Sequence, residues 1–121
     1  MSTVTLKEMS SLVNGRMPFH GNSVFATWVS NNLYVVYSYG THFPMYVYDA
    51  NASVFDEVGN EVSKGVWLGN TDKYSVTTSK HQSTTRPREV HKWLDTYGLK
   101  DVIHEGGYTR HLIFRGEPLA A

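Results

Sequence analysis

The segment from Thr77 to Arg88 carries the residue types best suited to contact an anion. Six of its side chains are hydroxyls: Thr77, Thr78, Ser79, Ser83, Thr84 and Thr85. Between them stand Lys80, His81, Gln82, Arg86 and Arg88. Hydroxyls and amides donate hydrogen bonds to phosphate oxygens, and lysine and arginine displace the counterions of a polyanion. The composition is typical of an anion- or nucleic-acid-binding surface, and also of a solvated connection between elements.

The charges of the chain are unevenly distributed although they cancel in total, with 11 basic and 11 acidic residues. Five basic residues lie between Lys73 and Lys92, against the single acid Glu89, which leaves a surplus of four. Four acids lie between Asp49 and Lys64, against Lys64 alone, which leaves a deficit of three. We therefore predict an exposed basic patch and a separate acidic projection. The candidate binding residues are Thr78, Ser79, Lys80, His81, Arg86 and Arg88.

The same segment also allows a catalytic hypothesis. His81 has the residue type of a general base, and Lys80 and Arg86 are cations suited to stabilise a phosphodiester transition state. The hydroxyls of Ser79 and Tyr74 lie nearby in the sequence. Together they would form a small metal-free nuclease site. Because nothing in the sequence fixes their mutual geometry, we assign no catalytic residue.

Metal and cofactor chemistry find little support. The chain has six histidines and no cysteine, so thiolate sites and disulfides are excluded. On a predicted hairpin, His104 and His111 would be diagonal neighbours, but zinc needs at least a third protein ligand. We expect no metal and no cofactor. The eight tyrosines are good strand formers that usually lie at the edge of a core, and they are also able to stack nucleic-acid bases.

The first half of the chain predicts a helix followed by an antiparallel meander. Residues Thr3 to Asn14 show helical spacing of apolar residues and end at Gly15, a typical C-terminal cap. Three strands follow, at Ser23–Val29, Leu33–Tyr39 and Phe43–Tyr48. Both faces of the second strand are apolar. We expect a helix to cover one face and tyrosine rings the other.

The second half predicts an acidic excursion over Asp49–Lys64 with a turn at Gly59-Asn60, then a short strand at Val66–Leu68. A helix is predicted from Pro87 to about Tyr97, with Gly98 as its stop and a core-facing stripe of Val90, Trp93, Leu94 and Tyr97. A closing hairpin is predicted from Asp101–His104 and Tyr108–Phe114 around a Gly106-Gly107 turn, with frayed residues from Glu117 to Ala121. The fold class is α+β, in a single domain over residues 1–121.

Three runs of residues resemble a family of small uncharacterised bacteriophage proteins. They are Tyr37-Ser38-Tyr39-Gly40-Thr41, then Val47-Tyr48-Asp49, and then the run from Asn70 to Ser83 that contains "YSVTTSKHQS". The similarity extends over about Asn22 to Arg86. The acidic excursion from Asn51 to Gly65 and the hairpin after Gly98 are additions relative to the shorter members. The resemblance implies a viral accessory protein made in an infected bacterium, and it transfers no catalytic residue.

The sequence thus favours a non-enzymatic protein that binds a host protein or a nucleic acid, of the host-takeover or anti-defence type. The alternative is the metal-free nuclease built around His81 with Lys80 and Arg86. The first twenty residues contain Lys7, Glu8 and Arg16 and no apolar run, and no stretch approaches the ~18 apolar residues of a membrane span. We expect a cytoplasmic location in the bacterial host and no membrane partner. The oligomeric state is left open.

Overall fold

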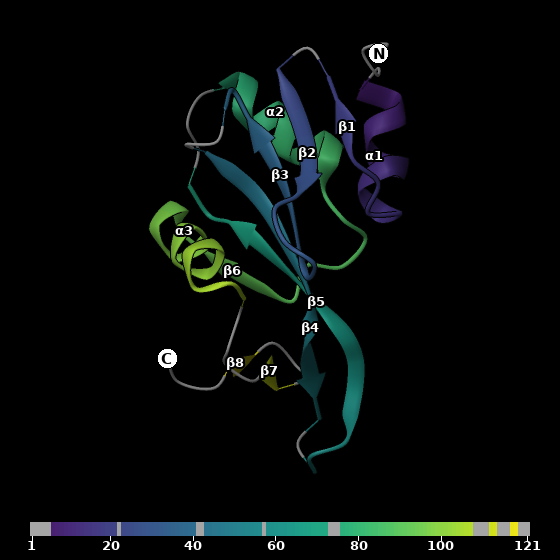
Figure 1. Ribbon diagram of the computed structural model, residues 1–121, viewed down its shortest axis with the longest axis vertical. Helices are drawn as coiled ribbons and strands as arrows, with labels where there is room; N and C mark the ends of the chain where they lie inside the picture. Colours follow the sequence, from purple (N-terminus) through teal and green to yellow (C-terminus); the bar gives the residue numbers. More distant parts are fainter. Residues whose placement is uncertain are drawn as a thin grey trace.

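A computed structural model describes residues 6–21, 23–40, 43–56, 58–72, 76–107, 112–113 and 117–118. Over these residues a mixed sheet packs against three helices, so the predicted α+β class is confirmed (Figure 1). No helix of this described part is both long and apolar enough to cross a membrane.

The sheet begins as the predicted meander. Its successive antiparallel strands are β1 (Phe19–His20), β2 (Val24–Trp28), β3 (Leu33–Ser38), β4 (Pro44–Phe55) and β5 (Glu61–Asn70). Strand β6 (Lys92–Leu94) then pairs in parallel with β5. At the far end of β4, the short strand β7 (Leu112–Ile113) pairs in parallel with it, and β8 (Glu117–Pro118) pairs with β7.

Helices cover both faces of this sheet. Helix α1 (Leu6–Asn14) and helix α2 (Val76–Thr85) lie on one face, and α3 (Thr96–Glu105) lies on the other (Figure 1). Strand β3 shows the division, because Leu33 and Val35 pack in the cluster of α3 while Tyr34 and Val36 pack in that of α1. Our expectation that tyrosine rings alone would cover one face is therefore wrong.

The helix predicted from Pro87 to Tyr97 is also wrong. The polar segment itself forms α2, Pro87 follows it, and Trp93 lies in β6 with 38% of its surface exposed. The apolar spacing misled because Asp95 starts a different helix: its carboxylate accepts the Gly98 N–H at 2.7 Å, so α3 begins at Thr96. Gly98 accordingly lies inside α3 rather than at a helix end.

The polar sequence of α2 is stabilised by hydrogen bonds where an ordinary helix uses apolar contacts. The Gln82 side chain is buried and donates to the carbonyls of Asn70 and Asp72, both at 3.2 Å. The main-chain carbonyl of Gln82 accepts a hydrogen bond from the Tyr46 hydroxyl at 2.7 Å. Burial raises the pKa of Tyr46 to about 12, so this hydroxyl stays a donor. Sequence periodicity does not detect a helix held in this way.

The predicted closing hairpin is wrong in its first half, because Asp101–His104 belongs to α3. Gly106 is the C-terminal cap of that helix at φ 85°, and Gly107 has φ 157°. The positive φ values are therefore confirmed, but they end a helix instead of joining two strands. Residues 108–111 and 114–116 lie outside the described chain. An antiparallel pair does follow, formed by β7 and β8, so Glu117–Pro118 is paired, while 119–121 lie outside the described residues.

The acidic excursion is an extension of the sheet. Strands β4 and β5 continue past its body as a two-stranded arm that projects from the rest of the molecule (Figure 1). Asp56 closes the tip, since its carboxylate accepts the N–H groups of Val58 and Asn60, which lowers its pKa. Asp56 and Glu61 lie on this arm, whereas Asp49 is buried at its base; Glu57 lies outside the described residues.

Candidate cationic clefts

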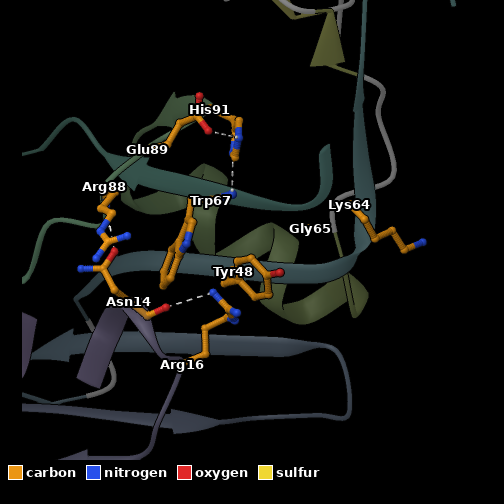
Figure 2. A pocket seen from close by; sticks show the side chains of 9 residues that line it. All are labelled: Asn14, Arg16, Tyr48, Lys64, Gly65, Trp67, Arg88, Glu89 and His91. Carbon is orange, nitrogen blue, oxygen red and sulfur yellow. Dashed lines mark hydrogen bonds and ion pairs between the residues drawn. The ribbon is translucent and has the colours of Figure 1, made fainter. Parts of the chain in front are cut away.

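The face of the sheet that carries α1 and α2 contains two adjoining clefts. The first has a volume of about 330 Å³ and lies between the end of α1, strands β4 and β5, and the connection from α2 to β6 (Figure 2). The second has a volume of about 610 Å³ and lies between α1 and the same connection. Asn14 and Arg88 line both, so the two clefts adjoin at these residues.

Two aromatic rings form the floor of the first cleft (Figure 2). Tyr48 and Trp67 face each other across β4 and β5 with ring centroids 5.0 Å apart. Gly65 keeps this floor open, because its φ of 95° suits glycine and a β-carbon there would collide with the Tyr48 ring. The cleft therefore depends on a glycine at the point where the arm leaves the sheet.

Arg16 occupies the rim in an unusual backbone conformation. It has φ 53° and ends α1, with its N–H bonded to the Val13 carbonyl at 3.0 Å and the Met17 N–H bonded to the Leu12 carbonyl at 2.9 Å. This is the helix-ending position that usually holds glycine, and any other residue there costs about 1 kcal/mol. Our predicted cap, Gly15, is one residue too early. The sequence thus tolerates strain to place a guanidinium here.

The Arg16 side chain is held against the aromatic floor. Its guanidinium lies 4.7 Å from the centroid of the Tyr48 ring and donates to the Asn14 carbonyl at 3.1 Å. A second arginine repeats the arrangement beside the second cleft, where the Arg86 guanidinium lies 5.2 Å from the Trp93 ring. An arginine of each cleft therefore lies over an aromatic ring, and only in the first cleft does that ring belong to the lining.

Asn14 joins the two sides of the clefts. Its side-chain oxygen accepts a hydrogen bond from the main-chain N–H of Arg88 at 3.0 Å, and its side-chain nitrogen donates to the main-chain carbonyl of Ser10 at 2.9 Å. These two bonds fix the connection after α2 to the last turn of α1. Arg88 is thereby positioned on the rim although it belongs to no helix or strand.

His91 lines the first cleft, and one of its ring nitrogens is held by the backbone. Its Nδ1 accepts the Trp67 N–H at 3.0 Å, so in the neutral ring the hydrogen is on Nε2. Nε2 lies 3.3 Å from the Glu89 carboxylate. Its Nδ1 and its main-chain N–H both bond to the backbone of Trp67, so His91 positions the start of β6 against β5.

The clefts carry a strong positive charge. Among the described residues that line them are four cations, Arg16, Lys64, Arg86 and Arg88, and one carboxylate, Glu89. None of the four forms an ion pair with a carboxylate of the described residues, and Glu89 is paired with His91. We call these four residues the cationic face. Its charge is available to an external anion.

The structure divides the predicted binding residues. Arg86 and Arg88 are exposed and line the clefts, and Lys80 is exposed on α2. His81 is buried, so our prediction of an exposed His81 is wrong: its Nδ1 lies 3.0 Å from the Ser38 hydroxyl, and its ring centroid lies 5.6 Å from that of Tyr39. This burial lowers the pKa of His81. The backbones of Thr78 and Ser79 lie in α2, and their side chains are outside the description.

Sequence reasoning missed Arg16, Tyr48, Lys64 and Trp67, which come from three separate segments. Lys64 was counted only as the lone cation of the acidic excursion and Trp67 only as a strand residue, while Tyr48 was one of the eight tyrosines noted as able to stack bases. One signal was present: an arginine directly after a predicted helix-capping glycine. Among the described residues, no group of three or more histidine or acidic side chains forms a metal site.

Comparison of the chain with protein-family models, with curated proteins and with solved structures finds no match. The resemblance to bacteriophage proteins therefore stays an expectation from the sequence.

Proposed function

We propose that this protein is a non-enzymatic binding protein that engages a polyanionic partner through the cationic face. The observation that carries the proposal is the gathering of Arg16, Lys64, Arg86 and Arg88 around two adjoining clefts, with no ion pair to a described carboxylate. Unpaired arginines at a concave surface are suited to phosphate or carboxylate groups, because the guanidinium presents a fork of donors.

The charge layout supports the same proposal at longer range. Arg16, Arg86 and Arg88 lie on the body of the molecule and Lys64 at the base of the projecting arm, whereas the carboxylates of Asp56 and Glu61 lie toward the tip of that arm. A protein of zero net charge with this separation acts as a dipole. Such a dipole orients the cationic face toward an approaching polyanion and raises the rate of association, and salt weakens both effects.

The setting of this function is taken from the resemblance noted in the sequence. We propose that the protein is a bacteriophage accessory protein that acts in the cytoplasm of an infected bacterium, where it binds a host protein or a nucleic acid. The nuclease alternative gains no support from the geometry, because His81 contacts Ser38 in the interior while Arg86 lies over Trp93. A general base needs access to the substrate proton.

The test is a capture experiment from bacterial lysate with matched charge reversals. Arg88→Glu removes a cation from both clefts, and Lys100→Glu makes the same charge change on exposed α3, on the other face of the sheet. We expect Arg88→Glu to lose the captured partner and Lys100→Glu to retain it. Nuclease treatment of the lysate then separates a protein partner from a nucleic acid. Equal capture by the two variants would contradict the proposal.

A second pair of variants tests whether the partner binds the cationic face or the acidic arm. Lys80→Glu asks whether the binding surface extends along α2, and Glu61→Lys asks whether the acidic arm contributes. We expect a modest loss for Lys80→Glu and no loss for Glu61→Lys. If Glu61→Lys is the damaging change and Arg88→Glu is harmless, the partner is cationic and the proposal is wrong.

A further inference from the structure

We infer that the occupant of the two clefts is a single-stranded nucleic acid, with its phosphates on Arg88, Arg86 and Lys64 and a base stacked on the Arg16–Tyr48 pair. This inference rests on the proposed function and names the partner class.

The first argument is the pairing of cations with aromatic rings. A surface for an acidic protein segment needs cations alone, whereas the first cleft also presents Arg16 over the Tyr48 ring, and Arg86 of the second cleft lies over Trp93, a ring outside its lining. Flat guanidinium groups and aromatic rings are the groups on which single-stranded bases stack. Trp93 is 38% exposed, and Arg16 and Tyr48 are each partly exposed, so these groups are within reach of a ligand.

The second argument is the extent of the surface. The clefts have volumes of about 330 and 610 Å³. Each is within the usual range of a small-molecule site, roughly 300–1,000 Å³. Two such sites joined through Asn14 and Arg88 suit a ligand that repeats itself along its length. A strand with a phosphate and a base in every unit meets this requirement.

The third argument excludes duplex DNA as the favoured form. A projecting two-stranded ribbon has the shape that enters a major groove, and the β4–β5 arm is such a ribbon. However, Asp56 and Glu61 lie on that arm, where they repel phosphate. The cations instead line concave surfaces, which a flexible single strand can enter and a stiff duplex cannot follow closely. Shape and charge therefore agree only for the single strand.

The test measures binding to three fluorescent probes by anisotropy: an oligothymidylate of about 15 nucleotides, a duplex of the same length, and a polyglutamate peptide. We expect the oligothymidylate to bind at least about tenfold more tightly than either competitor. The slope of log K against log salt should be near about −2, because the three cations that contact phosphates contribute about 0.7 each. Equal or tighter binding of the duplex or of polyglutamate would overturn the inference.

Variants separate the charge contribution from the stacking contribution. Lys64→Gln should reduce the salt slope by about 0.7. Tyr48→Leu should weaken binding about tenfold and leave the slope unchanged, since it removes a ring and no charge. Because Tyr48→Leu also alters the floor of the cleft, Arg16→Gly provides a second arm: glycine suits φ 53°, so the fold is kept while the stacking group is lost. Arg16→Lys keeps the positive charge but lacks the planar guanidinium group on which a base can stack.

We expect Arg16→Gly and Arg16→Lys both to weaken oligothymidylate binding about tenfold and to leave the slope nearly unchanged, because Arg16 contacts a base and not a phosphate. If Arg16→Lys binds as the wild type does, base stacking on this pair is wrong. If a host protein is captured through Arg88 while no probe strand binds, the inference fails and the proposed function stands. If Arg88→Glu captures the same partners as the wild type, both the inference and the proposed function fail.

Discussion

The two faces of the sheet are held in different ways. On the α3 side, Leu99 and Val102 pack into a closed apolar cluster with Leu33, Val47 and Leu68. On the other side, α1 also packs through Met9 and Val13, but the connection after α2 is fixed by Asn14, and clefts remain between these segments. The comparison indicates that both faces have an apolar core, and that the α1–α2 face in addition leaves room and charge beside its core. Each prediction below tests that division.

The largest expected effect is on the α3 face. Leu99 is fully buried there, so Leu99→Ala should lower the free energy of unfolding by about 2–5 kcal/mol, from lost burial and the cavity that remains. Denaturant titration measures the loss. Trp93→Ala on the cleft face is the comparison, and we expect about 1–2 kcal/mol because the ring is 38% exposed. Equal losses would remove the distinction between the faces.

A second prediction concerns the glycines that end α3. A β-carbon on Gly107 would lie 2.8 Å from the Asp49 carboxylate, whereas one on Gly106 would meet open space. Asp49 is buried and accepts the Asn32 side-chain N–H at 3.0 Å, so Gly107→Ala should disturb this bond and cost about 1–3 kcal/mol. Gly106→Ala should cost only the strain of its φ, about 1 kcal/mol. Thermal melts that rank the two variants in the opposite order would contradict this explanation.

The third prediction is that the stability of the protein depends on pH through His81, a buried residue of α2. Because burial lowers the pKa of His81, the unfolded chain binds a proton more readily than the folded one. The stability contribution is complete above the unfolded value of about 6.5 and is lost as the pH falls through the lower folded value. Melting temperatures should therefore drop between pH 7 and pH 5. His81→Gln should flatten that drop, and an unchanged profile in the variant would assign the dependence to another group.

The smallest expected effect on stability accompanies a large expected effect on binding. Arg16→Gly relieves the strain at φ 53° but removes the contact with Tyr48, so the free energy of unfolding should change by less than about 1 kcal/mol. Binding of the polyanionic partner should nevertheless weaken. A loss of stability of several kcal/mol would show that Arg16 is a structural residue and would weaken the contrast between the faces.

The sequence predicts the meander well because its signal is local. Alternating apolar residues and turn residues define β2 and β3 to within a residue or two. The region after Asn70 is not predicted, because what decides it is not local: α2 is polar and is held by Gln82, and α3 begins at the Asp95 cap. Periodicity records which side chains are apolar, and it cannot record which polar side chain will find a buried partner.

The candidate site shows the same limit. Arg86 and Arg88 were predicted, because a local surplus of charge is visible in the sequence. Arg16 and Lys64 were not, because the meander and the connection after α2 bring them to the same surface from distant positions. His81 was predicted to be exposed from the polarity of its neighbours, and its contact with Ser38 across 43 positions overrides that polarity.

The hydrogen bond between Asn14 and Arg88 connects positions 74 residues apart. Contacts of such separation form only after the intervening chain has paid its loop-closure entropy, so they belong to the late part of folding. A partly synthesised chain that lacks Arg88 has neither cleft complete. A basic disordered tail would hold polyanions as soon as it emerged from the ribosome, whereas the proposed binding surface of this protein exists only once α1 has met the connection after α2.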